Sequence, residues 1–224
     1  MLNQELNLNQ NFFNEDVERQ PTRKGYGTGL VELGESDNNI VVLSADLTES
    51  TQAHLFAEKF PDRIFQMGVA EQNMVGLATG LAEAGLIPFI YSIVPFAVLR
   101  PYEFIRNGPL QHRLPVRIVG VGAGLDYSTN GLSHYAVDDI GVMRVQPNLR
   151  IIAPADAEQT HHALLATWNL PETIYYRLGK DDRIRIAGLN GRFALDQVEL
   201  VSRGENAKIL LLATGSIATE MLQA

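Results

Sequence analysis

The sequence contains no cysteine. Disulfide bonds, thiolate nucleophiles and cysteine-based metal sites are therefore excluded, and the absence fits a cytoplasmic location. No apolar stretch approaches the roughly 18 residues that a bilayer-spanning helix needs. Residues 1–20 are rich in asparagine and glutamine and lack the apolar segment of a signal peptide, so we interpret them as an extended arm or a flexible leader.

Positive charge is also scarce. Lysine and arginine total 18 against 26 aspartate and glutamate residues, which gives a formal net charge of −8. This balance argues against nucleic acid or an anionic membrane as the main partner. The 224 residues, 46% of them hydrophobic, are enough for one sizeable core and part of a second domain. The composition therefore predicts a globular protein.

Apolar runs of strand length alternate with helical patterns along most of the chain. The strands are predicted at 40–43, 63–67, 87–93, 116–121, 149–153 and 173–177. The helices are predicted at 22–35 (with Thr22 as N-cap), 51–60, 71–84, 100–112, near Val137 and at 156–169. This alternation is typical of βαβ units, so we predict an α/β fold with a mostly parallel sheet covered by helices on both faces.

Several polar or aromatic residues fall at or just after the predicted strand ends. In parallel α/β sheets, ligands bind beyond the carboxyl ends of the strands. The residues at these positions are Asp46, Glu71, Phe96, the loop 122–134 and Arg177. Their positions are the strongest purely physical argument for a site at that edge of the sheet.

The segment 68–82 combines a lone carboxylate with small residues. Glu71 begins the predicted helix, and a carboxylate there is explained by its favourable interaction with the helix dipole. The dipole does not explain why small residues stand where better helix formers would fit. Those residues are Gly76, Ala78, Gly80 and Ala82. They indicate a close approach by another backbone or by a ligand.

The character of the sequence changes after Arg185. Residues 186–204 contain several glycines and mixed charges, and we interpret them as a linker with room for a hairpin. Residues 205–224 predict one further strand, a turn and the start of a helix. One βα unit cannot bury both faces of its strand. Either the chain is truncated, or this unit docks on the main domain or on a partner.

The segment 68–74, Gly-Val-Ala-Glu-Gln-Asn-Met, resembles the pyrimidine-binding domain of the thiamine-diphosphate enzymes of the transketolase group. Other segments resemble the same family in the same order, namely 22–24, 44–50, 131–134, 152–157 and 212–216. The resemblance covers about residues 20–224. It implies a thiamine-diphosphate-binding fold, with a pyrimidine-binding domain at 21–185 and the first βα unit of the family's C-terminal domain at 205–224.

The Gly-Asp-Gly motif of the family's diphosphate-binding domain is missing from this sequence. The resemblance therefore implies the C-terminal subunit of a split transketolase, which shares thiamine diphosphate with a separate diphosphate-binding N-terminal subunit. Mg²⁺ is expected on that partner subunit, and no metal ligand is assigned to this chain. A homodimer or a heterotetramer is the expected assembly.

The resemblance also implies roles for residues around the cofactor. In the family, a carboxyl group at the position of Glu71 bonds N1′ of the aminopyrimidine and takes part in its proton relay. Phe96 falls where the family places an aromatic ring against the pyrimidine, and Tyr102 is the alternative because the local sequence departs from the family pattern. Asp46 is expected to organise the cofactor pocket or the subunit contact.

A second set of residues corresponds to the family's substrate pocket. His134 is expected to act as a proton donor or a hydrogen-bond partner of the sugar. Asn130 stands where transketolases commonly have an aspartate that meets a substrate hydroxyl. Arg23, Ser50 and Arg177 match positions that contact the sugar phosphate, which the forked guanidinium of arginine suits.

The reaction that the resemblance implies is the transfer of a two-carbon ketol unit between sugars. Three alternatives remain open. They are a condensation of pyruvate with a sugar phosphate, as in deoxyxylulose-phosphate synthesis, the β subunit of a 2-oxo acid dehydrogenase, and a non-catalytic chain that only binds a partner. The segments 22–24 and 44–47 favour transketolase over the dehydrogenase.

Overall fold

A parallel six-stranded sheet forms the centre of the computed structural model, which describes residues 18–48, 52–186 and 189–222. The strand order is β3-β2-β4-β5-β7-β6. The strands are β2 (Ile40–Ser44), β3 (Ile64–Gln66), β4 (Ile87–Ile93), β5 (Arg117–Val121), β6 (Leu149–Ile152) and β7 (Thr173–Leu178). The predicted α/β class with a mostly parallel sheet is confirmed.

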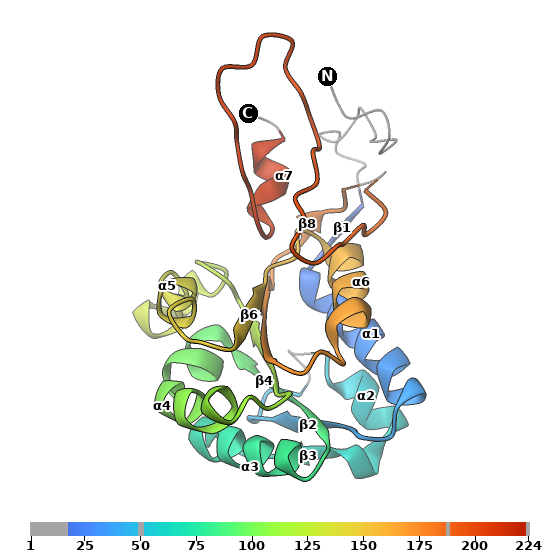
Figure 1. Cartoon of the computed structure of the whole chain (residues 1–224), viewed down its shortest axis with the longest axis vertical. Helices are drawn as coiled ribbons and strands as arrows, with labels where there is room; N and C mark the ends of the chain where they lie inside the picture. The colour runs from blue at the N-terminus through green and yellow to red at the C-terminus, as the bar shows by residue number, and fades with distance from the viewer. Residues whose placement is uncertain (1–17, 49–51, 187–188, 223–224) are drawn as a thin grey trace.

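Helices cover both faces of this sheet (Figure 1). One face carries α1 (Thr22–Ser36), α2 (His54–Lys59) and α6 (Ala157–Thr167), and the other carries α3 (Glu71–Glu83), α4 (Tyr102–Ile105) and α5 (Asp139–Met143). Alternate residues of β2 enter the two cores, with Ile40 and Val42 on the α1 side and Val41 and Leu43 on the α3 side. Within the described residues, no helix has both the length and the apolar character of a membrane span.

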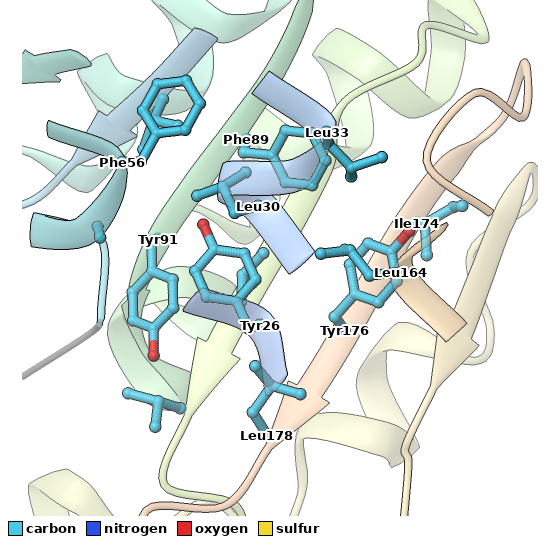
Figure 2. Packing of buried hydrophobic residues seen from close by; sticks show 14 of the residues in the cluster. Tyr26, Leu30, Leu33, Phe56, Phe89, Tyr91, Leu164, Ile174, Tyr176 and Leu178 are labelled. Carbon is cyan, nitrogen blue, oxygen red and sulfur yellow. The ribbon is translucent and has the colours of Figure 1, made fainter. Parts of the chain in front are cut away.

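Helix α1 lies against the middle of the sheet. Tyr26 and Leu30 point from α1 toward Phe89 and Tyr91 of β4 (Figure 2), and the rings of Tyr26 and Tyr91 are 5.0 Å apart. Gly25 faces α6 so closely that a Cβ atom there would lie 1.8 Å from the carbonyl oxygen of Ala157. A glycine in this helix therefore has a packing reason, because it lets α1 and α6 approach each other.

The N-terminus of α6 is held by its own side-chain cap. The backbone N–H of Gln159 donates to the Asp156 carboxylate at 2.8 Å, and the N–H of Ile186 donates to the other oxygen at 2.9 Å. The Thr22 cap predicted for α1 is wrong, because Pro21 occupies the N-cap position. The Thr22 hydroxyl instead accepts a hydrogen bond from the N–H of Gly179 at 2.6 Å, which joins α1 to the end of β7.

The single helix predicted over 100–112 is also wrong. A π-helical turn η3 (Pro95–Leu99) precedes α4, and a second π-helical segment η4 (Arg106–Leu110) follows it. Pro101 and Pro109 cannot donate helical hydrogen bonds, and Gly108 adopts non-helical angles of φ −86° and ψ −105°. The other short helices are η2 (Pro61–Arg63), η5 (Ser128–Asn130) and η6 (Leu132–His134).

The two ends of the domain meet in a small antiparallel sheet that the sequence did not predict. β1 (Arg19–Gln20) pairs with β8 (Arg183–Ile184). The strand predicted after residue 205 is wrong, since residues 207–214 form an exposed segment without regular structure, before α7 (Ile217–Met221). Ile209 is 79% exposed, and in Figure 1 this segment stands beyond the sheet and leads back toward it, where the Thr214 hydroxyl donates to the carbonyl oxygen of Ala153 at 3.4 Å. Its backbone has no strand beside it to pair with, among the described residues.

Candidate functional site

Glu71 begins α3, directly after β3 and a turn through Gly68. Gly68 has a φ of +65°, a conformation that glycine adopts without steric cost. The turn places the Glu71 carboxylate beyond the carboxyl end of the sheet, where the sequence predicted a site. Its side chain is only 3% exposed. The helix N-terminus favours the negative charge, and burial makes a partner for it necessary.

Arg100 is that partner, and sequence reasoning did not identify it. Its Nη1 donates to both Glu71 carboxylate oxygens, at 2.8 Å each. Arg100 follows the π-helical turn η3, 29 residues after Glu71, and its side chain is 38% exposed. No local spacing rule connects two residues so far apart, so the ion pair is visible only in the folded chain.

The ring of Phe96 contacts the same guanidinium. The Cζ atom of Arg100 is 4.2 Å from the Phe96 ring centroid, close enough for a cation–π contact. The ring of His134 packs edge-on against Phe96 at 5.2 Å, and the ring of Tyr127 lies 6.3 Å from that of His134. The predicted residues Glu71, Phe96 and His134 therefore belong to one continuous group of side chains.

Tyr102, the alternative to Phe96, has other contacts. Its hydroxyl donates to the carbonyl oxygen of Val142 at 3.0 Å and accepts a hydrogen bond from Gln146. Its ring packs against the core on the α3 side of the sheet. Tyr102 thus connects α4 to the end of α5. The geometry favours Phe96 over Tyr102 as the aromatic ring that contacts the Glu71–Arg100 pair.

The loop that carries His134 is fastened at several points. Gly124 and Ala136 form an isolated β-bridge across its base. The Asp126 carboxylate accepts from the backbone N–H of Lys180 at 2.7 Å and from Nη2 of Arg183 at 3.1 Å. Asn130 is exposed at the end of η5. These contacts hold the loop, and with it His134, against the chain that follows β7.

Arg177 forms hydrogen bonds at the base of the same loop. Its Nε donates to Asp139 Oδ2 at 2.7 Å, and its Nη2 donates to Asp139 Oδ1 at 3.2 Å and to the carbonyl oxygen of Ala136 at 3.0 Å. The Tyr175 hydroxyl also donates to Asp139, at 2.7 Å. Burial, followed by the charge of Asp139, raises the pKa of Tyr175 well above its usual value. A phosphate-binding role for Arg177 stays a prediction.

The remaining predicted residues are spread around this edge of the sheet. Arg23 lies in the first turn of α1, where its charge opposes the rise that burial causes in the pKa of Tyr127. Asp46 follows β2, is exposed and has a φ of 58°, a left-handed conformation that aspartate tolerates. Ser50 lies outside the described residues. The roles of these three residues stay predictions.

The chemistry of this group suits a planar heteroaromatic ligand. A buried carboxylate can bond the nitrogen edge of such a ring while a neighbouring phenyl ring covers its face. In the structure, Glu71 and Phe96 already make these two contacts with one planar group, the Arg100 guanidinium. Among the described residues, no cluster of three or more His, Asp or Glu side chains is arranged to hold a metal ion.

The fold defines a parallel α/β domain with a candidate ligand site at the carboxyl ends of its strands. Residues 18–182 match the family model described as "Transketolase, pyrimidine binding domain". The chain belongs to this transketolase pyrimidine-binding domain family. The family is thiamine-diphosphate dependent, and Glu71 stands at the start of α3 within the matched region.

Individual relatives carry related descriptions. A "Putative transketolase C-terminal section" from Methanocaldococcus jannaschii is 40% identical over 90% of this chain and 64% of its own length. A "6-deoxy-6-sulfo-D-fructose transketolase subunit" from Clostridium sp. (strain MSTE9) is 32% identical over 95% of this chain and 65% of its own. The present chain thus spans less than two thirds of these relatives.

A solved structure described as "Split gene transketolase, inactive beta4 tetramer" has 41% sequence identity and a TM-score of 0.69. The match covers 78% of this chain and 56% of that chain. The same fold is therefore present in a protein of comparable sequence.

Proposed function

We propose that this chain supplies the pyrimidine half of a thiamine diphosphate site in a transferase that moves a two-carbon ketol unit between sugars. The observation that carries the proposal is the buried Glu71 carboxylate, which Arg100 connects to the ring of Phe96, at the start of a helix within the matched family region. The descriptions of the relatives as transketolase subunits or sections support the same reaction class.

Each residue of the group has a separate task in this proposal. Thiamine diphosphate, when bound, supplies the electron sink for breaking and forming the carbon–carbon bond. Glu71 holds a proton at its carboxyl oxygen for the pyrimidine edge, and Phe96 packs against the ring face. Burial of Glu71 keeps water from competing for that hydrogen bond. Asp46 organises the pocket from the end of β2.

His134 and the residues around it form the substrate side. His134 lies against Phe96, which supports its assignment as a hydrogen-bond donor to a sugar held beside the pyrimidine. Arg23, Ser50 and Arg177 are assigned to the sugar phosphate, with Arg177 also supporting the loop through Asp139. Asn130 stands in place of an acidic residue. A modified or unphosphorylated sugar is therefore among the donors to be tested.

The exposed side of α3 is our candidate for the contact with the diphosphate-binding partner, which would also carry Mg²⁺. Gly76 and Gly80 are exposed with open space at their Cβ positions, and Leu77 between them is 41% exposed. Ala78 and Ala82 instead face the core, so only the glycines fit the predicted close approach. A hollow of about 350 Å³ adjoins this side, lined by Gly76, Thr79, Glu103, Phe104, Asn107 and Gly108.

The proposal is tested by reconstitution. This chain is copurified with a diphosphate-binding transketolase chain, and the mixture is assayed with ketose phosphates, a sulfonated ketose and pyruvate as donors. We expect ketol transfer by the mixture and none by either chain alone. Pyruvate as the preferred donor would favour the condensation reaction instead. Turnover by this chain alone would contradict a shared site, whereas assembly without turnover on any donor would favour a partner-binding role.

Two further expectations accompany the proposal. The assembly is a homodimer or a heterotetramer, and light scattering of the reconstituted mixture measures which. The cytoplasmic location stays a prediction from the sequence, to be checked by fractionation.

A further inference from the structure

Arg100 makes two contacts with one planar group. The guanidinium edge donates to both carboxylate oxygens of Glu71 at 2.8 Å, and its face lies over the Phe96 ring, with Cζ 4.2 Å from the ring centroid. Glu71 and Phe96 are the two residues that the proposed function assigns to the aminopyrimidine. The guanidinium therefore uses both recognition elements of the proposed pocket at once.

A guanidinium and an aminopyrimidine bind in the same kind of surroundings. Both are planar, both present a polar nitrogen edge to a carboxyl group, and both stack a face on an aromatic ring. Two such groups cannot occupy the space between Glu71 and Phe96 together. We propose that Arg100 is an internal occupant of the pyrimidine pocket, which the cofactor must displace; this inference rests on the proposed function.

The Arg100 side chain is able to move out of the space between Glu71 and Phe96. Its side chain is 38% exposed, whereas that of Glu71 is 3% exposed. The residue stands between η3 and Pro101, and its backbone N–H donates to Pro95 at 3.0 Å. The backbone is thus held while the side chain extends toward solvent. A swing of the side chain about its own torsions opens the pocket without unfolding an element.

The internal occupant has a consequence for cofactor affinity. While Arg100 fills the pocket, only the open fraction of molecules can bind a pyrimidine, so the apparent dissociation constant rises by the inverse of that fraction. At the same time, the ion pair keeps the buried Glu71 carboxylate compensated in the free chain. Arg100 therefore maintains the empty site and makes its loading depend on the additional binding energy of the partner's diphosphate half.

The test measures binding of the free aminopyrimidine fragment, 4-amino-2,5-dimethylpyrimidine, to the full chain by ligand-observed NMR. This probe needs neither the diphosphate half nor turnover. We expect Arg100→Met to bind it about tenfold more tightly than the wild-type chain. Arg100→Lys keeps the charge but loses the planar fork, so it is expected to bind more tightly as well. Arg144→Met, at an exposed arginine beyond α5, is the charge-matched control and should bind as the wild type does.

Methylguanidinium provides the second measurement. Added at millimolar concentration, it should refill the pocket of Arg100→Met, raise the apparent dissociation constant of the fragment toward the wild-type value and raise the melting temperature of that variant. The wild-type chain should show neither effect, because its own guanidinium is already in place. Thermal unfolding of Arg100→Lys gives the same comparison if Arg100→Met does not fold.

The outcomes separate the two proposals. Equal or weaker fragment binding by both Arg100 variants would overturn the internal-occupant inference, while fragment binding that is lost in Glu71→Gln would leave the proposed pyrimidine site intact. Absence of fragment binding by the wild type and every Arg100 variant would overturn both. Tighter binding by the Arg100 variants that methylguanidinium reverses supports both.

Discussion

The guanidinium of Arg177 and the carboxylate of Asp139 form a buried ion pair, with Nε 2.7 Å from Oδ2. Asp139 is 1% exposed at its side chain and Arg177 18%. The pair joins the end of β7 to the start of α5, and Arg177 also bonds Ala136 at the base of the loop. One ion pair thus connects the sheet, a helix and the loop that carries His134.

Removal of one member of this pair should destabilise the chain strongly. Asp139→Asn leaves the largely buried Arg177 charge uncompensated, and we expect a loss of about 3–5 kcal/mol in the free energy of unfolding. Urea unfolding measures it. Asp138→Asn is the control, since Asp138 is exposed and makes no side-chain cap, and its cost should stay within about 0.5 kcal/mol. Equal effects in the two variants would show that the ion pair is not structurally important.

The close packing of α1 on α6 predicts a specific sensitivity to a single methyl group. An added Cβ at Gly25 would lie 1.8 Å from the carbonyl oxygen of Ala157, so Gly25→Ala must push the helices apart. We expect a cost of about 1–3 kcal/mol in urea unfolding. An unchanged or raised midpoint would contradict the close approach of the two helices.

An added methyl group on the exposed side of α3 is expected to stabilise the chain. Gly80 has open space at its Cβ position, so Gly80→Ala should stabilise the isolated chain by roughly 0.5–1 kcal/mol through helix propensity. If another chain packs on this side of α3, the same methyl group should weaken assembly with the diphosphate-binding partner. Titration calorimetry measures that affinity. If the variant is more stable and assembles as well as the wild type, the partner does not pack on this side of α3.

Buried tyrosines predict a loss of stability at alkaline pH. Burial raises the pKa of Tyr176 from 10.0 to about 12, although the charge of Arg117 and the hydrogen bond with Thr167 oppose the rise. The folded state then holds this proton more tightly than the unfolded state. The stabilisation is complete below about pH 10 and decreases as pH rises toward 12, by about 3 kcal/mol in total for this residue.

Unfolding free energies at about pH 9 and about pH 11 test this pH dependence. Burial is also the first cause of the raised pKa values of Tyr26, Tyr91 and Tyr175, so the decrease should exceed the contribution of Tyr176 alone. Tyr176→Phe should show a shallower decrease than the wild type between these pH values. An identical decrease would exclude Tyr176 as a contributor.

The choice between the two aromatic candidates is also open to measurement. Phe96→Leu removes the ring that contacts Arg100 and should weaken thiamine diphosphate binding in the reconstituted complex by about threefold to tenfold. Tyr102→Phe removes a hydroxyl that bonds Val142 and should leave cofactor affinity unchanged. Fluorescence titration with the cofactor compares them. The reverse order of effects would assign the stacking role to Tyr102.

The sequence predicted the sheet well because each buried strand has its own apolar run. The bounds 87–93 predicted for β4 are those observed, and α1 and α3 start at their predicted residues. The predictions failed where the structure of a segment depends on residues that are distant in the sequence. The apolar run after residue 207 reads as a strand, yet it has no neighbouring strand among the described residues, and the helix over 100–112 is interrupted by proline and glycine.

The same distinction applies to the site. Glu71 was predicted as a site residue because its neighbours form a local motif, and Phe96 and His134 because they follow strand ends in order. Arg100 and Asp139 were missed because their importance depends on partners 29 and 38 residues away in the chain. Only the topology of the sheet brings such residues together. Local sequence therefore locates the carboxylate, whereas the folded chain identifies the cation that neutralises it.

The role of Glu71 is tested most directly by one substitution in the reconstituted complex. Glu71→Gln keeps the shape of the side chain but removes the carboxyl that holds the proton, and Glu83→Gln makes the same change at the exposed end of the same helix. Steady-state ketol transfer is measured for both, with partner affinity as the check on assembly. We predict that Glu71→Gln assembles normally and loses about 10²–10⁴-fold in turnover while Glu83→Gln keeps wild-type activity. Wild-type turnover by Glu71→Gln would contradict the assignment.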